Sequence, residues 1–547
     1  MKNLWFLLKE EIAKNLKVEI EEIEEPDKYG DFAYPCFNLA KKSKRNPNDI
    51  AKELAEKVNI KFLDAKATGS YVNFFIKWGE FSQELLKNID EKYGSGNEKE
   101  TVIMDVFQPN PFKPFHIGHI RNAVLGESIR RILDFQGKKT IAVSYMGDVG
   151  THVARWLWYY DKFYKGKIPK ENVSKWAGEV YAEATRKVAE KEEYEEEVKE
   201  VNKQLDERNP QLIEKWKKIR ELCLKDFWKI KDELGIHLDD NFYESEVEEP
   251  GKETVEKLIK EGKAKKSEGA IVADLEKYGL GTFLLLKSDG TALYSTKDLG
   301  LLELKRKRHK FDKSIFIVAE EQELYFKQLF KTMEIFKIPG WEKNVHVPYG
   351  LVTLKKGKMS SRFGTVILYE DFRDEMIKKV REILKDSDLD NKENVIRKVA
   401  FSAIKFSMLN IDNNKVIKFD WEQALDFEGK SGPYLQYSYV RTVNILKKAK
   451  LKDFDASLLK EDIERLLIKK IAQFPEIVKK SADQYSPSII TNYLFELSQD
   501  FNTFYQSLPV LKSEDKLKNA RLKLVDTVRI ILKNGLYLLG ISVMDKM

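Results

Sequence analysis

The chain has 547 residues, 42% of them hydrophobic and 12% aromatic, which excludes an intrinsically disordered protein and allows about three or four domains. Lysine and arginine total 96 against 89 for aspartate and glutamate, a formal charge of +7 that permits a polyanionic partner without requiring one. Two cysteines exclude a disulfide framework and a Cys-rich zinc site, and no run of about eighteen apolar residues occurs. We therefore expect a cytoplasmic protein without membrane association, structural zinc or other bound metal.

Residues 1–97 predict a small α+β domain. A helical pattern at the start is broken near Pro26, Gly30 and Pro35, and an alternating, strand-like segment follows at 69–76. A G-S-G-N linker at 94–97 ends this domain, and nothing in it suggests catalysis.

Residues 101–145 predict a βαβ unit. An apolar, strand-like run at 101–107 is followed by a proline-rich loop, and a helical pattern then begins near Gly118 and ends at Gly137. A second strand is predicted at 141–145.

Two histidines stand at the predicted start of that helix. His116 and His119 flank Gly118, where free backbone N–H groups and the positive end of the helix dipole attract phosphate. Imidazole donors beside them can hold a phosphoryl oxygen as charge develops, so the segment indicates a nucleotide site. Taken alone, the tetrapeptide is equally compatible with a chance pattern on a surface helix.

A long charged region at about 161–269 predicts an insertion in a catalytic domain that spans 98–400. Mixed charges at helical spacing are typical of a solvated helix face rather than of a dedicated binding surface. Strand-like segments at 270–273, 282–287 and 314–319 predict that a parallel sheet is completed after the interruption.

A second glycine-punctuated, basic segment lies at 351–366 and contains K-K-G-K-M-S-S-R. Its cations and hydroxyls suit a clamp on a polyphosphate, and an ordinary basic hairpin is the alternative. From Tyr369 the pattern is helical, which predicts an all-α domain at 401–547. Its tyrosines could stack on unpaired bases, but such residues are more often packed in the core.

H-I-G-H and K-M-S-S-R resemble the two signature motifs of class I aminoacyl-tRNA synthetases. Six segments resemble, more narrowly and in the right order, the arginyl-tRNA synthetase family: P-N-P-F-K-P-F-H-I-G-H-I-R-N, M-G-D-V-G-T-H, A-L-Y-S-T-K-D, A-E-E-Q-E-L, G-K-M-S-S-R-F-G-T-V and F-E-G-K-S-G-P-Y-L-Q-Y. The resemblance implies an α/β Rossmann-like catalytic domain, an additional N-terminal domain that meets the tRNA elbow, and a helical anticodon-binding domain.

The same resemblance implies the reaction. L-arginine would be activated with ATP, which brings Mg²⁺ with it, and the arginyl group would pass to the 3′ terminal ribose of arginine tRNA. We expect activation to depend on tRNA and the protein to be a monomer.

The resemblance also assigns roles to single residues. Asp298 and Tyr294 would face the guanidinium, whose rigid fork of donors needs carboxylate acceptors. Asp105, Asn110 and Gln322 would hold the backbone and stem of arginine.

Further roles follow for ATP and tRNA. ATP would be held by His116, Gly118, His119, Lys358, Met359, Ser360, Ser361 and Arg362. The tRNA would be contacted by Tyr71, Asn73, Tyr434, Gln436, Tyr437 and Met547.

Some positions depart from the family pattern. Ser361 replaces the second lysine of the general motif, and Lys113 stands just before H-I-G-H, where arginyl enzymes carry a substitute. Our hypothesis is that Lys113 and Arg362 share the stabilisation of phosphate charge with Lys358. Relatives often carry other residues at three more positions, with Glu at Asp105, Arg at Lys297 and His at Tyr325.

Three alternatives remain open. The first is a class I synthetase for another amino acid or an editing-type paralogue, against which Asp298 and the tRNA-domain segments argue. The second is a non-enzymatic tRNA-binding protein, against which the intact His116, His119 and Lys358 argue. The third is a nucleotidyltransferase that shares only H-x-G-H, which leaves the helical last domain unexplained.

Overall fold

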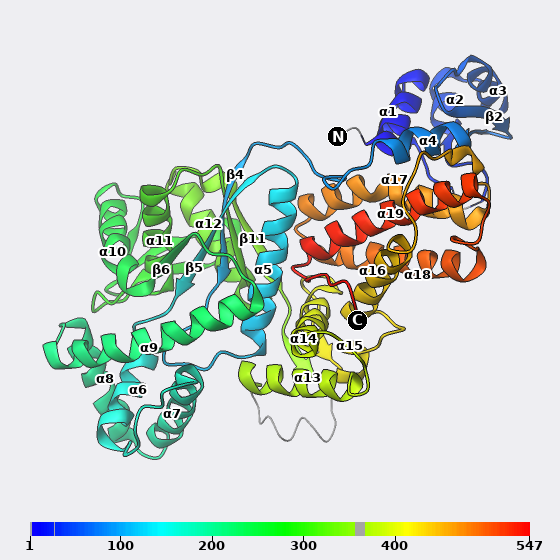
Figure 1. Ribbon diagram of the computed structural model, residues 1–547. Helices are drawn as coiled ribbons and strands as arrows, with labels where there is room; N and C mark the ends of the chain where they lie inside the picture. Colours follow the sequence, from blue (N-terminus) through cyan, green and yellow to red (C-terminus); the bar gives the residue numbers. More distant parts are fainter. Residues whose placement is uncertain (1–2, 27, 356–366) are drawn as a thin grey trace.

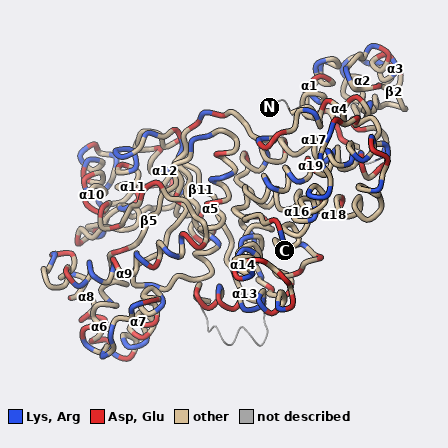
Figure 2. The backbone as a smooth tube through the Cα atoms, in the orientation of Figure 1, with Lys and Arg blue, Asp and Glu red and all other residues tan. Residues whose placement is uncertain are grey.

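The computed structural model describes residues 3–26, 28–355 and 367–547 (Figure 1). A small N-terminal domain lies against a helical C-terminal domain, and helix α5 (Ile117–Phe135) runs between the helical domain and an α/β domain. Basic and acidic residues are interspersed along all three parts of the chain (Figure 2). None of the described helices combines the length and apolar character that a membrane span requires.

The N-terminal domain is an antiparallel sheet, in the order β1-β3-β2, covered by helices. Alternate residues of a strand face the same side, and Val72, Phe74 and Ile76 point into the core in this way. The elements are α1 (Leu4–Leu16), η1 (Ile20–Glu22), β1 (Phe32–Pro35), α2 (Phe37–Ser43), α3 (Pro47–Lys57), β2 (Leu63–Thr68), β3 (Tyr71–Ile76) and α4 (Trp78–Lys87).

The N-terminal domain docks on the helical domain through specific polar contacts. The Tyr93 hydroxyl donates to the Ile471 carbonyl at 3.2 Å, and Glu91 pairs with Arg529 at 2.8 Å and with Lys533 at 2.9 Å. The domain boundary predicted at residue 97 falls in the connection between α4 and β4.

The described strands of the catalytic domain form a five-stranded parallel sheet in the order β11-β10-β4-β5-β6. The first strand of this sheet along the chain is the central β4. The next strands, β5 and β6, lie on one side of it, and β10 and β11 then lie on the other side, which is a doubly wound arrangement. In sheets of this kind ligands bind in the crevice outside the carboxyl ends of the strands where the winding reverses, and that place, here between β4 and β10, is called the crevice below. The strands are β4 (Thr101–Phe107), β5 (Lys139–Met146), β6 (Asp240–Tyr243), β10 (Lys313–Ala319) and β11 (Asn344–Tyr349).

Two of the three strands predicted to complete this sheet do not join it. β8 (Ala270–Asp274) pairs antiparallel with β9 (Thr282–Leu286) on one side and with β7 (Lys265–Ser267) on the other, in a separate small sheet. Only β10 enters the main sheet. The prediction was wrong because short apolar runs give strand identity but not pairing direction.

The predicted insertion also contains a strand of the main sheet. β6 pairs parallel with β5, with Val143 opposite Asp240 and Tyr145 opposite Phe242, although 240–243 lies inside the predicted range 161–269. D-N-F-Y is too short and too polar to show as a strand in sequence.

Helices α6 to α9 leave the sheet after β5 and return to it at β6 (Figure 1). Buried Trp156, Trp176 and Trp216 hold these helices together, so their charged faces cover an apolar centre. The remaining helices of the domain are α6 (Thr151–Lys162), α7 (Val173–Val188), α8 (Glu192–Asp206), α9 (Pro210–Leu234), α10 (Glu244–Lys260), η2 (Glu276–Tyr278), α11 (Tyr294–Arg308), η3 (Glu320–Gln322), α12 (Glu323–Ile335) and η4 (Trp341–Lys343).

The last part of the chain is helical apart from a short strand pair. The boundary predicted at residue 400 falls inside α14, because that helix continues without a break. The elements are β12 (Val352–Leu354), α13 (Tyr369–Ile383), α14 (Lys392–Leu409), β13 (Ile417–Phe419), α15 (Trp421–Ala424), α16 (Gly432–Leu446), η5 (Ala456–Leu458), α17 (Asp462–Asp483), α18 (Pro487–Ser507) and α19 (Asp515–Leu538).

We predict that Gly126→Ala weakens the packing of α5 on β4. An added Cβ would lie 2.8 Å from Cβ and 2.9 Å from Cα of Val106, well inside van der Waals contact. Overpacking of this kind costs about 1–3 kcal/mol, which should lower the melting temperature in thermal unfolding. Val106→Gly removes the Cβ that the new methyl group would meet, so Gly126→Ala should cost less in that background. Strictly additive losses would contradict this account.

Candidate active site

The loop after β4 and the start of α5 form one side of the crevice. The His116 Nδ1 accepts the Gly118 N–H at 3.2 Å, and the His119 Nδ1 accepts the His116 N–H at 3.2 Å. The two imidazoles stack with their centroids 3.9 Å apart. Because both Nδ1 atoms accept, the neutral tautomers assigned from this network carry their protons on Nε2, where they can donate to a ligand.

The charge state of the two histidines follows from their burial. Burial and the nearby Lys113 lower the pKa of His116, and burial, His116 and Lys113 hold the pKa of His119 well below its usual range. Both imidazoles are therefore neutral at pH 7. A neutral imidazole N–H beside a helix N-terminus can donate a hydrogen bond to a phosphate oxygen.

Lys113 supplies the positive charge of this region. Its Nζ lies 5.7 Å from the ring centroid of Tyr181 on α7, and it forms no ion pair with any described acidic residue. Gly178 allows α7 to come this close, since a Cβ there would lie 2.4 Å from Cβ of Pro114. The insertion therefore packs directly on the loop that carries Lys113.

Three carboxylates lie deeper in the crevice, on β4, α10 and α11. Glu244 accepts from Lys297 Nζ at 2.8 Å, and Asp298 accepts from the Tyr325 hydroxyl. Burial raises the pKa of Glu244, which Lys297 opposes, and burial raises the pKa of Asp298 to about 7. The hydroxyl of Tyr145 is buried nearby and has no hydrogen-bond partner among the described residues.

The third carboxylate, Asp105, is buried and paired with a lysine. Lys305 Nζ lies 2.6 Å from its Oδ1 and 2.8 Å from its Oδ2, and both side chains are fully buried. Lys305 thus compensates the charge of Asp105 within the chain, and the predicted contact of Asp105 with arginine stays a prediction. Asp105 forms the floor beneath the site.

The other residues predicted to hold arginine surround the crevice. The Asn110 Oδ1 accepts the Gly147 N–H at 3.0 Å, which ties the loop after β4 to the end of β5. Tyr294 is the first residue of α11 and is 69% exposed, and Gln322 is exposed at the end of η3, directly after β10. The structure brings these residues to one edge of the sheet.

Glu244 was missed in the sequence. It is the first residue of α10 and directly follows β6, so it sits at the carboxyl edge of the sheet like the other candidates. A Cβ at Gly147 would lie 3.0 Å from its Oε1 and 2.4 Å from the Asn110 Oδ1, which places both polar groups at the same turn. If residues 240–243 had been recognised as a strand, the position of Glu244 directly after that strand would have marked it as a candidate site residue.

The second phosphate-type segment cannot be placed. Lys358, Met359, Ser360, Ser361 and Arg362 lie outside the described residues. Their predicted contacts with ATP remain predictions. No group of three or more His, Cys, Asp or Glu side chains suited to a metal ion occurs in ranges 3–26, 28–355 and 367–547.

The two residues predicted to reach the tRNA from the N-terminal domain differ in exposure. Tyr71 is exposed at the start of β3, with its ring edge-on to the exposed Phe37 at 5.8 Å. Asn73 is only 5% exposed, because it lies in the central strand of the small sheet. Phe37 carried no signal in the sequence beyond its aromatic type.

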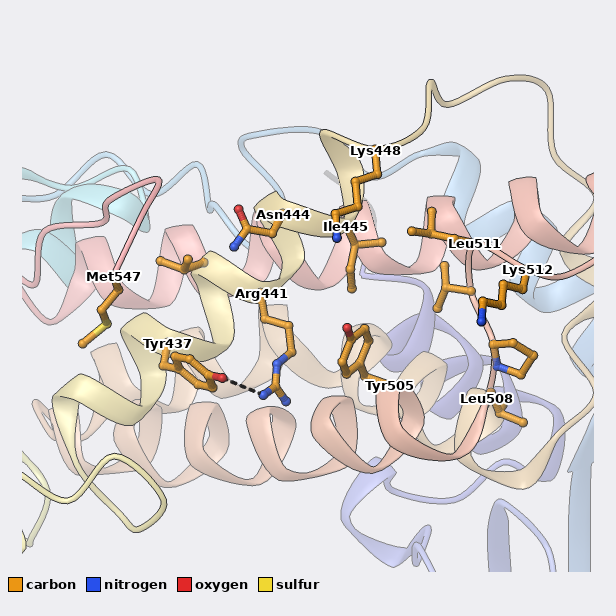
Figure 3. Close-up of a pocket in the computed structure, with 13 residues that line it drawn as sticks. Tyr437, Arg441, Asn444, Ile445, Lys448, Tyr505, Leu508, Leu511, Lys512 and Met547 are labelled. Carbon is orange, nitrogen blue, oxygen red and sulfur yellow. Dashed lines mark hydrogen bonds between the residues drawn. The ribbon is translucent and has the colours of Figure 1, made fainter. Parts of the chain in front are cut away.

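The four residues predicted to contact tRNA from the C-terminal domain also differ in exposure. Tyr434 and Gln436 are buried, where the Tyr434 hydroxyl accepts from Asn502 at 2.9 Å and Gln436 donates to the Ser542 carbonyl at 2.8 Å. Tyr437 and Met547 instead line a pocket of about 530 Å³ (Figure 3).

Arg441 organises this pocket. Its guanidinium lies 4.8 Å from the ring centroid of Tyr437 and 5.1 Å from that of Tyr505, and it donates to the Tyr437 hydroxyl at 3.0 Å (Figure 3). Lys448 and Lys512 add positive charge to the lining. Exposed aromatic rings beside fixed cations suit the stacking and charge of single-stranded nucleic acid.

The doubly wound sheet and the paired histidines at its central crevice define the catalytic domain of a class I aminoacyl-tRNA synthetase. The family model "tRNA synthetases class I (R), catalytic domain" matches residues 81–421. "Arginyl tRNA synthetase N terminal domain" matches residues 6–76, and "DALR anticodon binding domain" matches residues 435–547. The chain belongs to the arginyl-tRNA synthetase family.

Individual relatives agree along the whole chain. The arginine–tRNA ligase of Clostridium perfringens is 36% identical over 99% of both chains, and that of Halothermothrix orenii is 37% identical over 99% of this chain and 98% of its own. The solved arginyl-tRNA synthetase of Thermus thermophilus superposes with a TM-score of 0.84 at 26% identity, covering 99% of both chains.

We predict that Lys305→Met destabilises the fold. The substitution would leave Asp105 buried without its partner, at a cost of about 3–5 kcal/mol. Such a carboxyl group has a pKa above its unfolded value, so the loss should grow as pH rises above about 4. Thermal unfolding at several pH values measures this, and the double variant Asp105→Asn/Lys305→Met should recover part of the loss. Equal stability of the single variant and the parent chain would contradict the ion pair.

Proposed function

We propose that this chain activates L-arginine with ATP and transfers the arginyl group to the 3′ terminal ribose of arginine tRNA. The observation that carries the proposal is that a phosphate-type site and a carboxylate-rich recess lie next to each other in one crevice. Asn110, in the loop that leads to His116, accepts the Gly147 N–H at 3.0 Å, and a Cβ at Gly147 would lie 3.0 Å from Oε1 of Glu244, so the phosphate-type helix start and the carboxylate-rich recess are adjacent. The first suits ATP and the second suits a guanidinium.

In this proposal the recess recognises the side chain of arginine. Asp298 accepts from the guanidinium, Tyr294 closes over it, and Glu244 adds negative charge. A carboxylate pair matches the fork of N–H donors on a guanidinium better than it matches a point charge. Asp105, Asn110 and Gln322 hold the backbone and stem of the amino acid.

The chemistry then requires mainly orientation and charge. The arginine carboxylate attacks the α-phosphorus of ATP in line, a carboxylate–phosphorus bond forms, and the bond to pyrophosphate breaks. His116 and His119 hold phosphate oxygens, and Lys113 offsets charge on the leaving group together with Lys358 and Arg362. Magnesium enters with ATP as part of the substrate. The ribose hydroxyl of the tRNA next attacks the arginyl carbonyl and releases AMP.

The tRNA-binding roles follow from the two exposed surfaces. Tyr71 and its neighbour Phe37 present aromatic edges for an unpaired base at the tRNA elbow, with Asn73 behind them. The pocket around Tyr437 and Met547 would receive anticodon nucleotides, and Tyr434 and Gln436 support it from within the core. We further propose that the protein is a cytoplasmic monomer.

The amino-acid specificity is tested by ATP–pyrophosphate exchange with arginine, glutamate and cysteine, each with and without tRNA. We expect exchange with arginine only, and only when tRNA is present, because the carboxylate-lined recess selects a cation. Equal exchange with a non-cationic amino acid would end the arginine assignment. Binding of tRNA without exchange would support a non-enzymatic protein instead.

Lys113→Ala should lower arginine-dependent pyrophosphate exchange about 10²-fold, since removal of one donor to developing charge has effects of this size. Lys199→Ala is a matched control, because Lys199 pairs with the exposed Glu196 at 2.7 Å on α8. An unchanged exchange rate in Lys113→Ala would place the phosphate charge elsewhere.

A further inference from the structure

The three carboxylates of the crevice are compensated unequally. Asp105 has Lys305 and Glu244 has Lys297, each within 2.8 Å. Asp298 has no ion pair with any lysine or arginine in the described ranges, and its hydrogen-bond donor there is the hydroxyl of Tyr325. Asp298 is therefore the carboxylate left to take its counter-charge from a ligand.

Tyr325 is held in a fixed position by its ring. It lies in the first turn of α12, and it packs edge-on against Phe283 of β9 at 5.5 Å and against Phe326 at 5.4 Å. Asp298 lies on α11, so the hydroxyl spans two helices that flank β10. A rotamer locked by packing can fix the orientation of the group that it contacts.

We propose that Tyr325 is a positioning residue for recognition of the substrate guanidinium. Its O–H donates to Oδ2 of Asp298, sets the plane of the carboxylate, and leaves Oδ1 for the substrate. The donor also stabilises the ionised form of Asp298, which is the form that binds a cation. This inference rests on the proposed function, in which Asp298 contacts arginine.

The surroundings of Asp298 make its ionised form costly. Burial raises its pKa to about 7, with the charges of Asp105 and Glu244 in the same direction, while Tyr325 and Lys305 lower it. The groups that act on it come from five elements, namely Asp105 of β4, Tyr145 of β5, Glu244 of α10, which Lys297 pairs with, Tyr294 and Lys305 of α11, and Tyr325 of α12. Use of arginine should therefore weaken as pH falls below about 7.

The test is Tyr325→Phe in the full-length chain, assayed by arginylation of tRNA between about pH 6 and 8.5. At pH 7 we expect kcat/KM for arginine to fall about tenfold, as for a lost hydrogen bond to a charged group. The KM for ATP should stay within about twofold. The acidic limb of the profile should move up by about one pH unit, because the ionised form has lost its donor.

Tyr159→Phe is the matched control. It removes a hydroxyl that donates to Glu183 at 2.8 Å between α6 and α7 of the insertion, and neither residue is among those placed at the crevice. It should leave both kinetic constants and the pH profile unchanged. A shift of the same size in this variant would overturn the proposal.

Asp298→Asn distinguishes the contact of Asp298 with arginine from the positioning role of Tyr325. If it leaves the KM for arginine unchanged, the assignment of Asp298 to arginine fails and the inference with it. If it raises that KM while Tyr325→Phe keeps the parent profile, only the role of Tyr325 is overturned. In the double variant the effect of Tyr325→Phe should disappear, since the two side chains act as one unit.

Discussion

The burial of α5 is the constraint on which the rest of the structure depends. Its apolar residues face the sheet on one side and the helical domain on the other, so the helix cannot fold in water without both. Its first turn holds the two stacked histidines, and its later turns hold the C-terminal domain. One helix thus fixes the distance between the catalytic crevice and the part of the chain that carries the second nucleic-acid surface.

The buried carboxylate of Glu127 on α5 is compensated within the same helix. Glu127 accepts from both Arg130 and Arg131 at 2.7 Å, and Arg131 in turn donates to the Tyr537 carbonyl at 3.1 Å. Lys405 on the neighbouring α14 donates to the Gly540 carbonyl, and burial lowers its pKa to about 8. Because these donors end on a backbone carbonyl in the last turn of α19 and on another just after that helix, they fix the position of the segment that leads to Met547.

The sequence was sufficient to predict the parts of the site that are formed by residues close together in the chain. The βαβ unit, the helix start at His116 and the three-domain order followed from periodicity and from motifs. Contacts between distant segments were not visible, and Asp105 with Lys305, 200 residues apart, is the clearest case. Residue type also could not separate buried Tyr434 from exposed Tyr437, because both occur in one turn of the same helix.

The docking of the N-terminal domain has a consequence for synthesis of the chain. Tyr93 meets Ile471, 378 residues later, and Glu91 meets Arg529 after 438 residues. At translation rates of about 5–20 residues per second, the interval between them is roughly 20 to 90 seconds. The docking face of the first domain, which includes the ring of Tyr93 that stacks on Phe474 in the folded chain, therefore stands uncovered on the ribosome for most of elongation.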